Sequence, residues 1–294
     1  MTTASPMPIA QLRNVSKIFD PDGAALVALN QVSLDIAPAR LTAVMGPSGS
    51  GKSTLMHVLA GLDRPSSGTV HIGKREITAL HEDELTALRR RRIGFVFQAF
   101  NLVPTLTVRE NILLPFELDD RKPNPDERAW ITNIIKRLGL DGRLKHRPGE
   151  ISGGQQQRTA IARALATRPD ILFADEPTGN LDGRSGREVM AIMSEAVREL
   201  GQSIVLVTHD PLVAAYADRV VFLADGTPVS ELNDTISAEV IAQTMLDLDA
   251  QAEAAENAAA GAPHDAAGAP HDAARTPHDA ARTPQYASET GGRR

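Results

Sequence analysis

Two kinds of hydrophobic pattern alternate along the chain. Apolar and polar positions alternate in residues 9–19 and 29–36, which predicts half-buried strands, and Pro21-Asp22-Gly23 between them predicts a hairpin turn. Short apolar runs predict further strands at residues 41–45, 69–72, 93–97, 171–175, 203–208 and 219–224. Segments of helical character lie between these runs, at residues 52–60, 81–92, 155–167 and 185–200. Strands that alternate with helices predict an α/β fold, with a mostly parallel sheet and helices on both faces.

The middle of the chain departs from this alternation. Residues 108–140 have helical periodicity throughout, and Pro115, Pro123 and Pro125 divide them into separate helices. This run predicts a helical subdomain at about residues 98–165. The expected layout is a flexible N-terminus at 1–8, a main domain at 9–232, a helix at 233–250 and a tail at 251–294.

The tail has a composition of its own. A Pro-His-Asp-Ala-Ala unit recurs with a step of seven residues from Pro263, and a proline in each unit excludes a coiled coil. Ala, Pro and polar residues cannot bury enough surface to offset the entropy of ordering, so residues 251–294 are expected to be disordered. His264, His271 and His278 could bind a metal weakly, but a solvated linker is the preferred interpretation.

Composition and charge narrow the classes of function. The 294 residues are 42% apolar, which suits a globular protein, and the net charge of −6 gives no reason to expect nucleic acid as the main partner. Cysteine is absent, which excludes disulfides, thiolate metal sites and a cysteine nucleophile. No signal-peptide pattern is visible, and no run approaches the ~18 apolar residues that span a bilayer. We therefore expect any membrane role to come through a partner chain.

A glycine-rich stretch follows the predicted strand at residues 41–45. It reads Gly46-Pro47-Ser48-Gly49-Ser50-Gly51-Lys52-Ser53-Thr54 and fits the pattern G-x-x-x-x-G-K-[ST]. Its glycines let the backbone wrap closely around phosphates, while Lys52 can reach the β- and γ-phosphates and Ser53 can coordinate Mg²⁺. The alternative is a turn that binds nothing, and the strand before it and the helix after it argue against that.

Two further motifs carry chemistry. Asp175 and Glu176 end an apolar strand. If this strand lies beside the phosphate loop, Asp175 would be near Mg²⁺, and Glu176 would be placed to orient or deprotonate a water molecule. Ser152, Gly153 and Gly154 precede a helix and form a second anion-binding corner. One nucleotide does not need two such corners in one subunit, so this corner is expected to face the ATP of another copy.

Together these residues resemble the ATP-binding subunit of ABC transporters, over about residues 9–232. The residues that carry the resemblance are the phosphate loop, Gln98, Ser152-Gly153-Gly154-Gln155, Asp175-Glu176, Asn180-Leu181-Asp182 and His209. Within the family, the stretches at 94–98, 106–111 and 176–182 resemble the lipoprotein-releasing and macrolide-export branch.

The sequence departs from the family pattern at two places. Ile151 replaces a Leu of similar volume, and Ala39-Arg40 replaces a Gly-Glu outside the phosphate contacts.

The resemblance implies a role for each matching residue. Glu176, His209 and Gln98 would be catalytic, and Ser53, Gln98 and Asp175 would hold Mg²⁺. Phe19 would stack on adenine, since Phe keeps the ring of the usual Tyr. The phosphate loop from Gly46 to Thr54 would bind the nucleotide. Ser152, Gly153, Gly154 and Gln155 would contact the γ-phosphate held by the opposite subunit, and Asp182 would belong to the D-loop.

The resemblance also implies the architecture and the partners. The fold would be a P-loop NTPase core with an N-terminal antiparallel β subdomain and an α-helical signature subdomain. ATP and Mg²⁺ would be the cofactors. The chain would form a homodimer on ATP binding and would drive a separate transmembrane permease from the cytoplasmic face of the membrane, without direct membrane insertion.

Three functions compete at this point. The first is an ATPase that energises export or lipoprotein release, and the second is a non-transport regulator that signals through a membrane partner to envelope processes. The third, a soluble ABC ATPase of DNA repair or translation, is disfavoured because there is only one phosphate loop and no coiled-coil insertion before Ser152. The Arg89–Arg92 run could be a nucleic-acid patch, but a solvated or partner-facing helix end is preferred.

Overall fold

The computed structural model describes residues 7–20, 24–233 and 236–260, which contain two β-sheets. The antiparallel sheet has the order β2-β1-β4-β5. Its strands are β1 (Ala10–Phe19), β2 (Leu26–Ile36), β4 (Ser67–Ile72) and β5 (Arg75–Glu76). The second sheet has the order β10-β9-β3-β8-β7-β6, and all its neighbours are parallel except β9 and β10. Its strands are β3 (Leu41–Met45), β6 (Ile93–Phe97), β7 (Ile171–Asp175), β8 (Ser203–Val207), β9 (Arg219–Ala224) and β10 (Thr227–Asn233).

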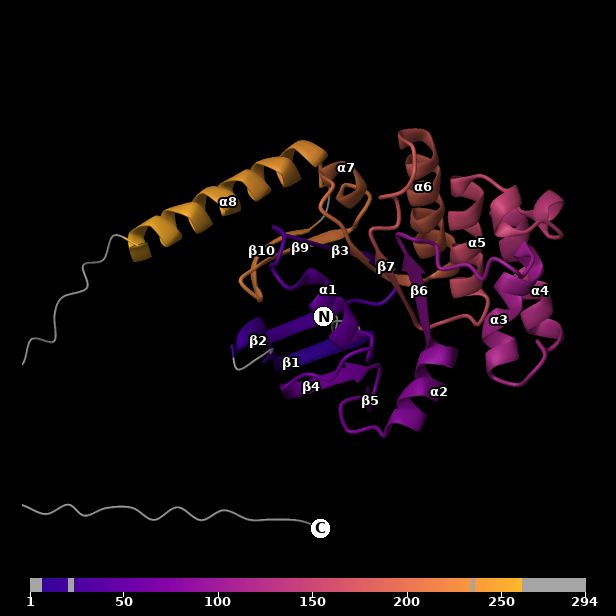
Figure 1. The fold of residues 1–294 in the computed structure, drawn as a ribbon, viewed down its shortest axis with the longest axis horizontal. Coiled ribbons are helices and arrows are strands. Elements are labelled where there is room, and N and C mark those ends of the chain that lie inside the picture. The colour runs from indigo at the N-terminus through magenta and orange to yellow at the C-terminus, as the bar shows by residue number, and fades with distance from the viewer. Residues whose placement is uncertain (1–6, 21–23, 234–235, 261–294) are drawn as a thin grey trace, which may run out of the picture. The chain divides into compact units, whose positions relative to one another are not determined.

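The helices lie between the strands along the chain, and three of them follow one another between β6 and β7 (Figure 1). They are α1 (Lys52–Leu59), α2 (Glu82–Arg92), α3 (Val108–Leu118), α4 (Pro125–Arg137), α5 (Gly153–Leu165), α6 (Gly183–Leu200), α7 (Pro211–Ala214) and α8 (Ala238–Ala260), with short 3₁₀ turns η2 (Asp141–Arg143) and η3 (Pro148–Glu150). The α/β class, the antiparallel N-terminal sheet and the mostly parallel second sheet are thereby confirmed. No helix within the described residues is both long enough and apolar enough to cross a bilayer.

Strand periodicity divides the hydrophobic core into two clusters. On β8, Val205 and Val207 point to the cluster that contains α1 and the antiparallel sheet, whereas Ile204 and Leu206 point to the cluster formed with α3–α6. Strands β7 and β9 divide in the same way. Side chains on a strand face alternate sides, so the second sheet is buried on both faces and its strands read as continuous apolar runs. Helix α1 is thus held between the two sheets.

The helical subdomain is fixed by capping and by its contacts with α5. Helix α4 begins with a capping box in which Asn124 and Glu127 bond each other's backbone N–H, and Pro125 occupies its first turn. The indole of Trp130 donates to the carbonyl of Leu165 at 2.8 Å, which ties α4 to the end of α5. Helix α5 also packs against α3, α6 and β6. Helix α5 is therefore the link between the helical subdomain and the second sheet.

Two segments differ from the sequence-based expectation. Strand β10 (Thr227–Asn233) was not predicted, because it is a polar edge strand whose residues are half-buried or exposed. The C-terminal helix ends at Ala260 rather than at residue 250, because an Ala-rich run without proline continues to that point and Ala has the highest helix propensity. The expectation of disorder is therefore wrong for residues 251–260, and residues 261–294 lie outside the described residues.

The arginine run at the end of α2 makes contacts within the chain. The guanidinium groups of Arg89 and Arg90 donate to the carbonyls of Gly61 and Leu118. Arg91 pairs with Asp119, and Arg92 pairs with Asp170. These contacts favour the interpretation of the run as a helix end over that of a nucleic-acid patch.

Candidate functional site

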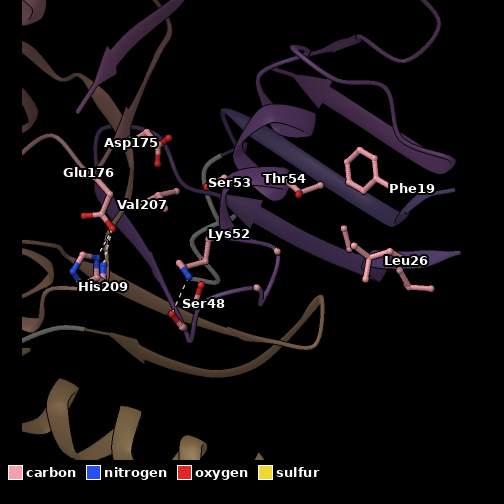
Figure 2. A pocket seen from close by; sticks show the side chains of 15 residues that line it. Phe19, Leu26, Ser48, Lys52, Ser53, Thr54, Asp175, Glu176, Val207 and His209 are labelled. Carbon is pink, nitrogen blue, oxygen red and sulfur yellow. Dashed lines mark hydrogen bonds and ion pairs between the residues drawn. The ribbon is translucent and has the colours of Figure 1, made fainter. Parts of the chain in front are cut away.

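An open cavity of about 510 Å³ lies where the antiparallel sheet, α1 and the second sheet meet (Figure 2). It brings together the predicted residues Phe19, Gly46, Ser48, Gly49, Gly51, Lys52, Ser53, Thr54, Asp175, Glu176 and His209. Residues that the sequence analysis did not single out also line it, namely Leu26, Val27, Ala28 and Val207. Pro47 and Ser50 belong to the same loop, but they do not line the cavity.

Glycines are required where the loop from β3 to α1 touches the two sheets. Gly46 has φ 148°, and a Cβ there would lie 2.0 Å from the carbonyl oxygen of Leu223 in β9. Gly51 has φ 97°, and a Cβ there would lie 2.3 Å from the carbonyl oxygen of Ala28 in β2. Both φ values are ones that L side chains rarely adopt. The loop is therefore in direct backbone contact with both sheets.

The N-terminus of α1 differs from those of the four helices α3, α4, α5 and α6. Its N-cap is Gly51, which offers no side-chain hydrogen bond, whereas Thr107, Asn124, Ser152 and Asp182 cap α3, α4, α5 and α6 with their side chains. The first N–H groups of a helix have no intrahelical acceptor, and the helix dipole adds positive potential there. An uncapped helix start that opens into a cavity is suited to bind phosphate oxygens.

Lys52 supplies the cation of the cavity. Its ammonium donates to the carbonyls of Gly46 at 2.9 Å and Pro47 at 2.7 Å, so it is folded back over the loop. Burial lowers the pKa of the Lys52 ammonium, and the negative charges of Glu176 and Asp175 oppose that effect. The ammonium therefore lies beside the loop. There, the oxygens of a bound phosphate would replace the two carbonyls as its hydrogen-bond acceptors.

Ser53 and Asp175 are the residues that would hold Mg²⁺. Both line the cavity and both offer oxygen ligands, which Mg²⁺ prefers. No cluster of three or more His, Cys, Asp or Glu side chains suited to a metal occurs among the described residues, so an ion here would take its other ligands from phosphates and water. Burial raises the pKa of the Asp175 carboxyl; the charge interactions with His57 and Lys52 oppose the rise, and that with Glu176 adds to it. The half-buried carboxylate would therefore gain from a bound cation.

Three donors hold the carboxylate of Glu176. Oε1 accepts from the backbone N–H of His209 at 3.1 Å and lies 2.7 Å from its Nδ1 (Figure 2). Oε2 accepts from the Thr208 hydroxyl at 3.2 Å. Glu176 has φ 44°, a left-handed conformation that a non-glycine residue seldom adopts. Thr208, which is fully buried, was not predicted as a site residue, although its position directly before His209 was a usable signal.

The other end of the cavity is apolar. Phe19 is 38% exposed and stands beside Leu26 and Val27, which are 61% and 49% exposed. The ammonium of Lys17 lies 4.8 Å from the centroid of the Phe19 ring and is paired with Asp63 at 2.7 Å. A cation against one face of an aromatic ring is favourable and fixes the ring. Phe19 can thus offer a flat apolar surface to a nucleobase.

Several predicted residues lie outside this cavity. Ser152 caps its own helix, since its hydroxyl accepts from the N–H of Gln155 at 3.3 Å and its N–H donates to the Gln155 side chain at 3.0 Å. Asp182 caps α6 through the N–H groups of Arg184 and Ser185. Neither the Ser152–Gln155 stretch nor Asp182 lines the cavity.

Gln98 is also absent from the cavity lining. Its side-chain amide donates to Oδ1 of Asn180 at 3.3 Å, and the Asn180 amide donates back to the Gln98 carbonyl at 3.0 Å. A Cβ on Gly179 would lie 2.7 Å from Nε2 of Gln98, so glycine lets the two segments approach. The predicted contact of Gln98 with Mg²⁺ therefore stays a prediction.

Comparison with known proteins places this geometry in a family. The profile of the ABC transporter family matches residues 29–179. The uncharacterized ABC transporter ATP-binding protein MJ1508 of Methanocaldococcus jannaschii is 44% identical over 223 residues, which are 76% of this chain and 99% of that protein. The chain belongs to the ABC transporter family.

Solved structures extend the comparison. The dimeric structure of MJ0796, a bacterial ABC transporter cassette, has a TM-score of 0.69 at 41% identity and covers 76% of this chain and 98% of that one. A post-hydrolysis state of the same cassette, dimeric and bound to ADP and Pi, matches equally well. CbiO1 of Clostridium perfringens, part of the ABC transporter complex cbiONQ, is 29% identical with a TM-score of 0.69 and covers 81% of this chain and 92% of that one. This chain is accordingly an ABC-type ATP hydrolase.

Further relatives identify the branch of the ABC transporter family. The macrolide export ATP-binding/permease protein MacB of Marinobacter nauticus is 43% identical over 240 residues, which are 82% of this chain but 37% of MacB. The MacB protein of Rhodopseudomonas palustris strain HaA2 is 47% identical over 221 residues, which are 75% of this chain and 34% of that protein. The chain therefore spans about a third of the length of these relatives. The predicted resemblance to the macrolide-export branch is confirmed at the level of the ATP-binding cassette.

Asp175→Asn should raise stability while abolishing activity. The pKa of this carboxyl is raised in the folded chain, so its charged form destabilises the fold at pH values above the ordinary aspartate pKa of about 3.9. The melting temperature of the nucleotide-free variant should exceed that of the wild type by a few degrees at about pH 8, and the gain should disappear towards about pH 4. ATP hydrolysis should fall at least about 100-fold, because the predicted Mg²⁺ ligand would be lost.

Thermal unfolding at both pH values, together with an ATPase assay, measures these effects. Asp120→Asn is the matched control, since Asp120 is an exposed aspartate after α3 and Asn tolerates its left-handed φ of 47° as well as Asp does. It should change neither quantity appreciably. A lower melting temperature for Asp175→Asn at about pH 8 would contradict the electrostatic description of the site.

Proposed function

We propose that two copies of this chain close head to tail around two ATP·Mg²⁺ and thereby drive a separate membrane permease of an export or lipoprotein-release system. The observation that supports this most directly is the separation, within one chain, of the phosphate loop from the predicted second anion-binding corner. The cavity holds the phosphate loop, whereas Ser152, Gly153 and Gly154 stand at the start of α5 and do not line it. A second copy can supply this corner to the open side of the cavity. The dimeric cassettes among the similar structures agree with such an arrangement.

In the proposed reaction, each residue has a separate role. The N-terminus of α1 and Lys52 bind the phosphates, and Phe19 stacks on the adenine. Bound Mg²⁺, held by Ser53 and Asp175, would neutralise charge on the β- and γ-phosphates. Glu176 accepts a proton from the attacking water, and Thr208 and His209 keep its carboxylate oriented. The ring of His209 is exposed, and it would reach the γ-phosphate once its Nδ1 leaves the Glu176 carboxylate, from which it lies 2.7 Å away. The Ser152 corner of the partner chain completes the site.

Glu176→Gln is expected to trap the closed dimer. Gln is nearly isosteric with Glu and retains an oxygen, but it cannot take a proton from water. Hydrolysis should fall by about 10²–10⁴-fold while ATP binding survives, so an ATP-bound dimer should accumulate. Size-exclusion chromatography with light scattering, with and without ATP, measures this directly. Ser152→Arg in the same background should prevent the dimer, because a bulky cation would fill the corner meant for the partner's γ-phosphate. A slowed variant that stays monomeric with ATP would contradict head-to-tail closure.

A groove between the helical subdomain and the second sheet supports a permease partner. It has a volume of about 380 Å³ and an apolar floor that includes Phe95, Leu114 and Pro115. Leu62 and Leu118 stand exposed beside it, and Arg89, Arg90 and Arg163 line it as well. A short amphipathic helix with acidic ends fits such a surface. We place a cytoplasmic loop of the permease here, which puts the cassette at the inner face of the membrane.

Cross-linking in living cells tests the permease contact. With a photoreactive benzophenone residue in place of Leu118, which is 62% exposed, irradiation should link the chain to a protein that carries membrane-spanning helices. Mass spectrometry identifies the product. The same residue in place of Val229, which is 47% exposed on β10, serves as the control and should give no such product. Products confined to proteins without spanning helices would count against the proposal.

The non-transport regulator remains the second candidate. It shares the proposed ATP site and dimer, so these residues support both functions equally. The partner captured at Leu118 separates them: a permease that carries a large extracytoplasmic domain and moves no substrate favours regulation. Capture of nucleic-acid-bound proteins alone would instead favour a soluble ATPase of DNA repair or translation.

A further inference from the structure

Gln157 is a buried polar residue in the signature helix α5, with no role so far. Its side chain has no exposed surface. Its Nε2 donates to the carbonyl oxygen of Pro177 and lies 3.5 Å from that of Phe97. Its Oε1 is buried and has no hydrogen-bond partner within the described part of the chain. A buried acceptor without a donor is unfavourable, so this amide is not placed there for packing alone.

The two carbonyls belong to the two catalytic segments. Pro177 directly follows Glu176, and Phe97 directly precedes Gln98. Helix α5 itself begins beside Ser152, the residue proposed to meet the γ-phosphate of the partner chain. One side chain, less than two turns from the start of the helix, therefore connects the signature to both segments.

Both segments have backbone conformations that need external support. Glu176 has φ 44°, and Phe100 and Asn101 have φ 60° and 50°. Such values are rare for L residues and persist only where neighbouring groups hold them. Arg163, which lies on the same helix as Gln157, donates to the carbonyls of Phe100 and Asn101. Burial lowers the pKa of the Arg163 guanidinium, which agrees with its largely enclosed position beside Phe100 and Asn101. Helix α5 thus supports both strained segments from one side.

A movement of α5 would displace both segments by a similar amount, because the helix is packed tightly. The helix packs against α3, α6 and β6 (Figure 1). Eight of its residues are buried, namely Gly154, Gln157, Thr159, Ala160, Ile161, Ala162, Ala164 and Leu165. Packed helices move as units rather than bend, because protein interiors deform little. The unpartnered Oε1 of Gln157 gives the amide a reason to exchange partners, since a shifted arrangement can satisfy an acceptor that this one leaves free.

We propose that Gln157 is a positioning residue that couples the two nucleotide sites of the dimer. When the partner's γ-phosphate engages Ser152, α5 shifts, and the Gln157 amide carries the shift to the Pro177 carbonyl and so to Glu176. Each carboxylate is then brought into its hydrolytic position only when the opposite site is filled. This inference rests on the proposed shared site, and it adds a cause for cooperative hydrolysis.

Gln157→Met tests the coupling. Met has a similar volume, but it cannot donate to the Pro177 carbonyl. We expect the Hill coefficient for ATP hydrolysis to fall towards 1 and kcat to fall about three- to tenfold, the rate equivalent of one neutral hydrogen bond. The affinity of separated chains for a fluorescent ATP analogue should not change, because Gln157 does not line the cavity. Gln156→Met is the matched control: this neighbouring side chain bonds only the Ile151 carbonyl, and its loss should leave both kinetic quantities as in the wild type.

The outcomes separate this inference from the proposed function. A Gln157→Met protein with a lowered melting temperature but wild-type kcat and Hill coefficient would make Gln157 purely structural. An equal loss of cooperativity in Gln156→Met would assign the effect to the helix rather than to this amide. If Gln157→Met does not fold, Gln157→Asn keeps the amide but is too short to reach Pro177, and the same result is expected. A wild type without ATP-dependent dimers or cooperativity would overturn the shared site and the coupling together.

Discussion

The phosphate loop can exist in this shape only because it touches the backbone of both sheets. Gly46 lies against the Leu223 carbonyl and Gly51 against the Ala28 carbonyl, at distances that admit no side chain. The turn at Gly226 completes the contact, since its N–H donates to the Ser50 carbonyl at 3.1 Å and its carbonyl accepts from the Asn30 N–H at 3.0 Å. The two sheets therefore hold α1 with its uncapped end towards the cavity. The cation at Lys52, the carboxylates at the end of β7 and the aromatic surface at Phe19 are all positioned relative to that end.

Much of this arrangement follows from the sequence, because its strongest signals are local. The apolar runs gave the buried strands, and the spacing of Gly46, Gly51 and Lys52 gave the loop and the helix after it. Features that depend on tertiary contacts could not be predicted. Strand β10 has a polar sequence and is a strand only because it pairs with β9. The bond of Gln98 to Asn180 and the orientation of Glu176 by Thr208 join segments that are far apart in the chain.

The separation of the two anion-binding corners connects the site to the proposed function. An ATPase complete within one chain would bind, hydrolyse and release nucleotide without any change in assembly. When the second corner comes from another copy, ATP binding becomes coupled to dimer closure, and hydrolysis becomes coupled to opening. Helix α5 begins at the shared corner and also lines the groove proposed for the permease, through Arg163 and Ala164. It is therefore the element through which closure, hydrolysis and the membrane partner can influence one another.

Cross-linking between defined positions tests the shared site most directly, and the chain suits it because it contains no cysteine. Ser48→Cys places a thiol on the phosphate loop, and Ser152→Cys places one at the signature. The two single-cysteine proteins, each with Glu176→Gln, are mixed and treated with a short bis-maleimide. The account predicts a cross-linked dimer that contains one chain of each kind and forms only with ATP. A double-cysteine chain that instead links its own two thiols as a monomer would contradict it.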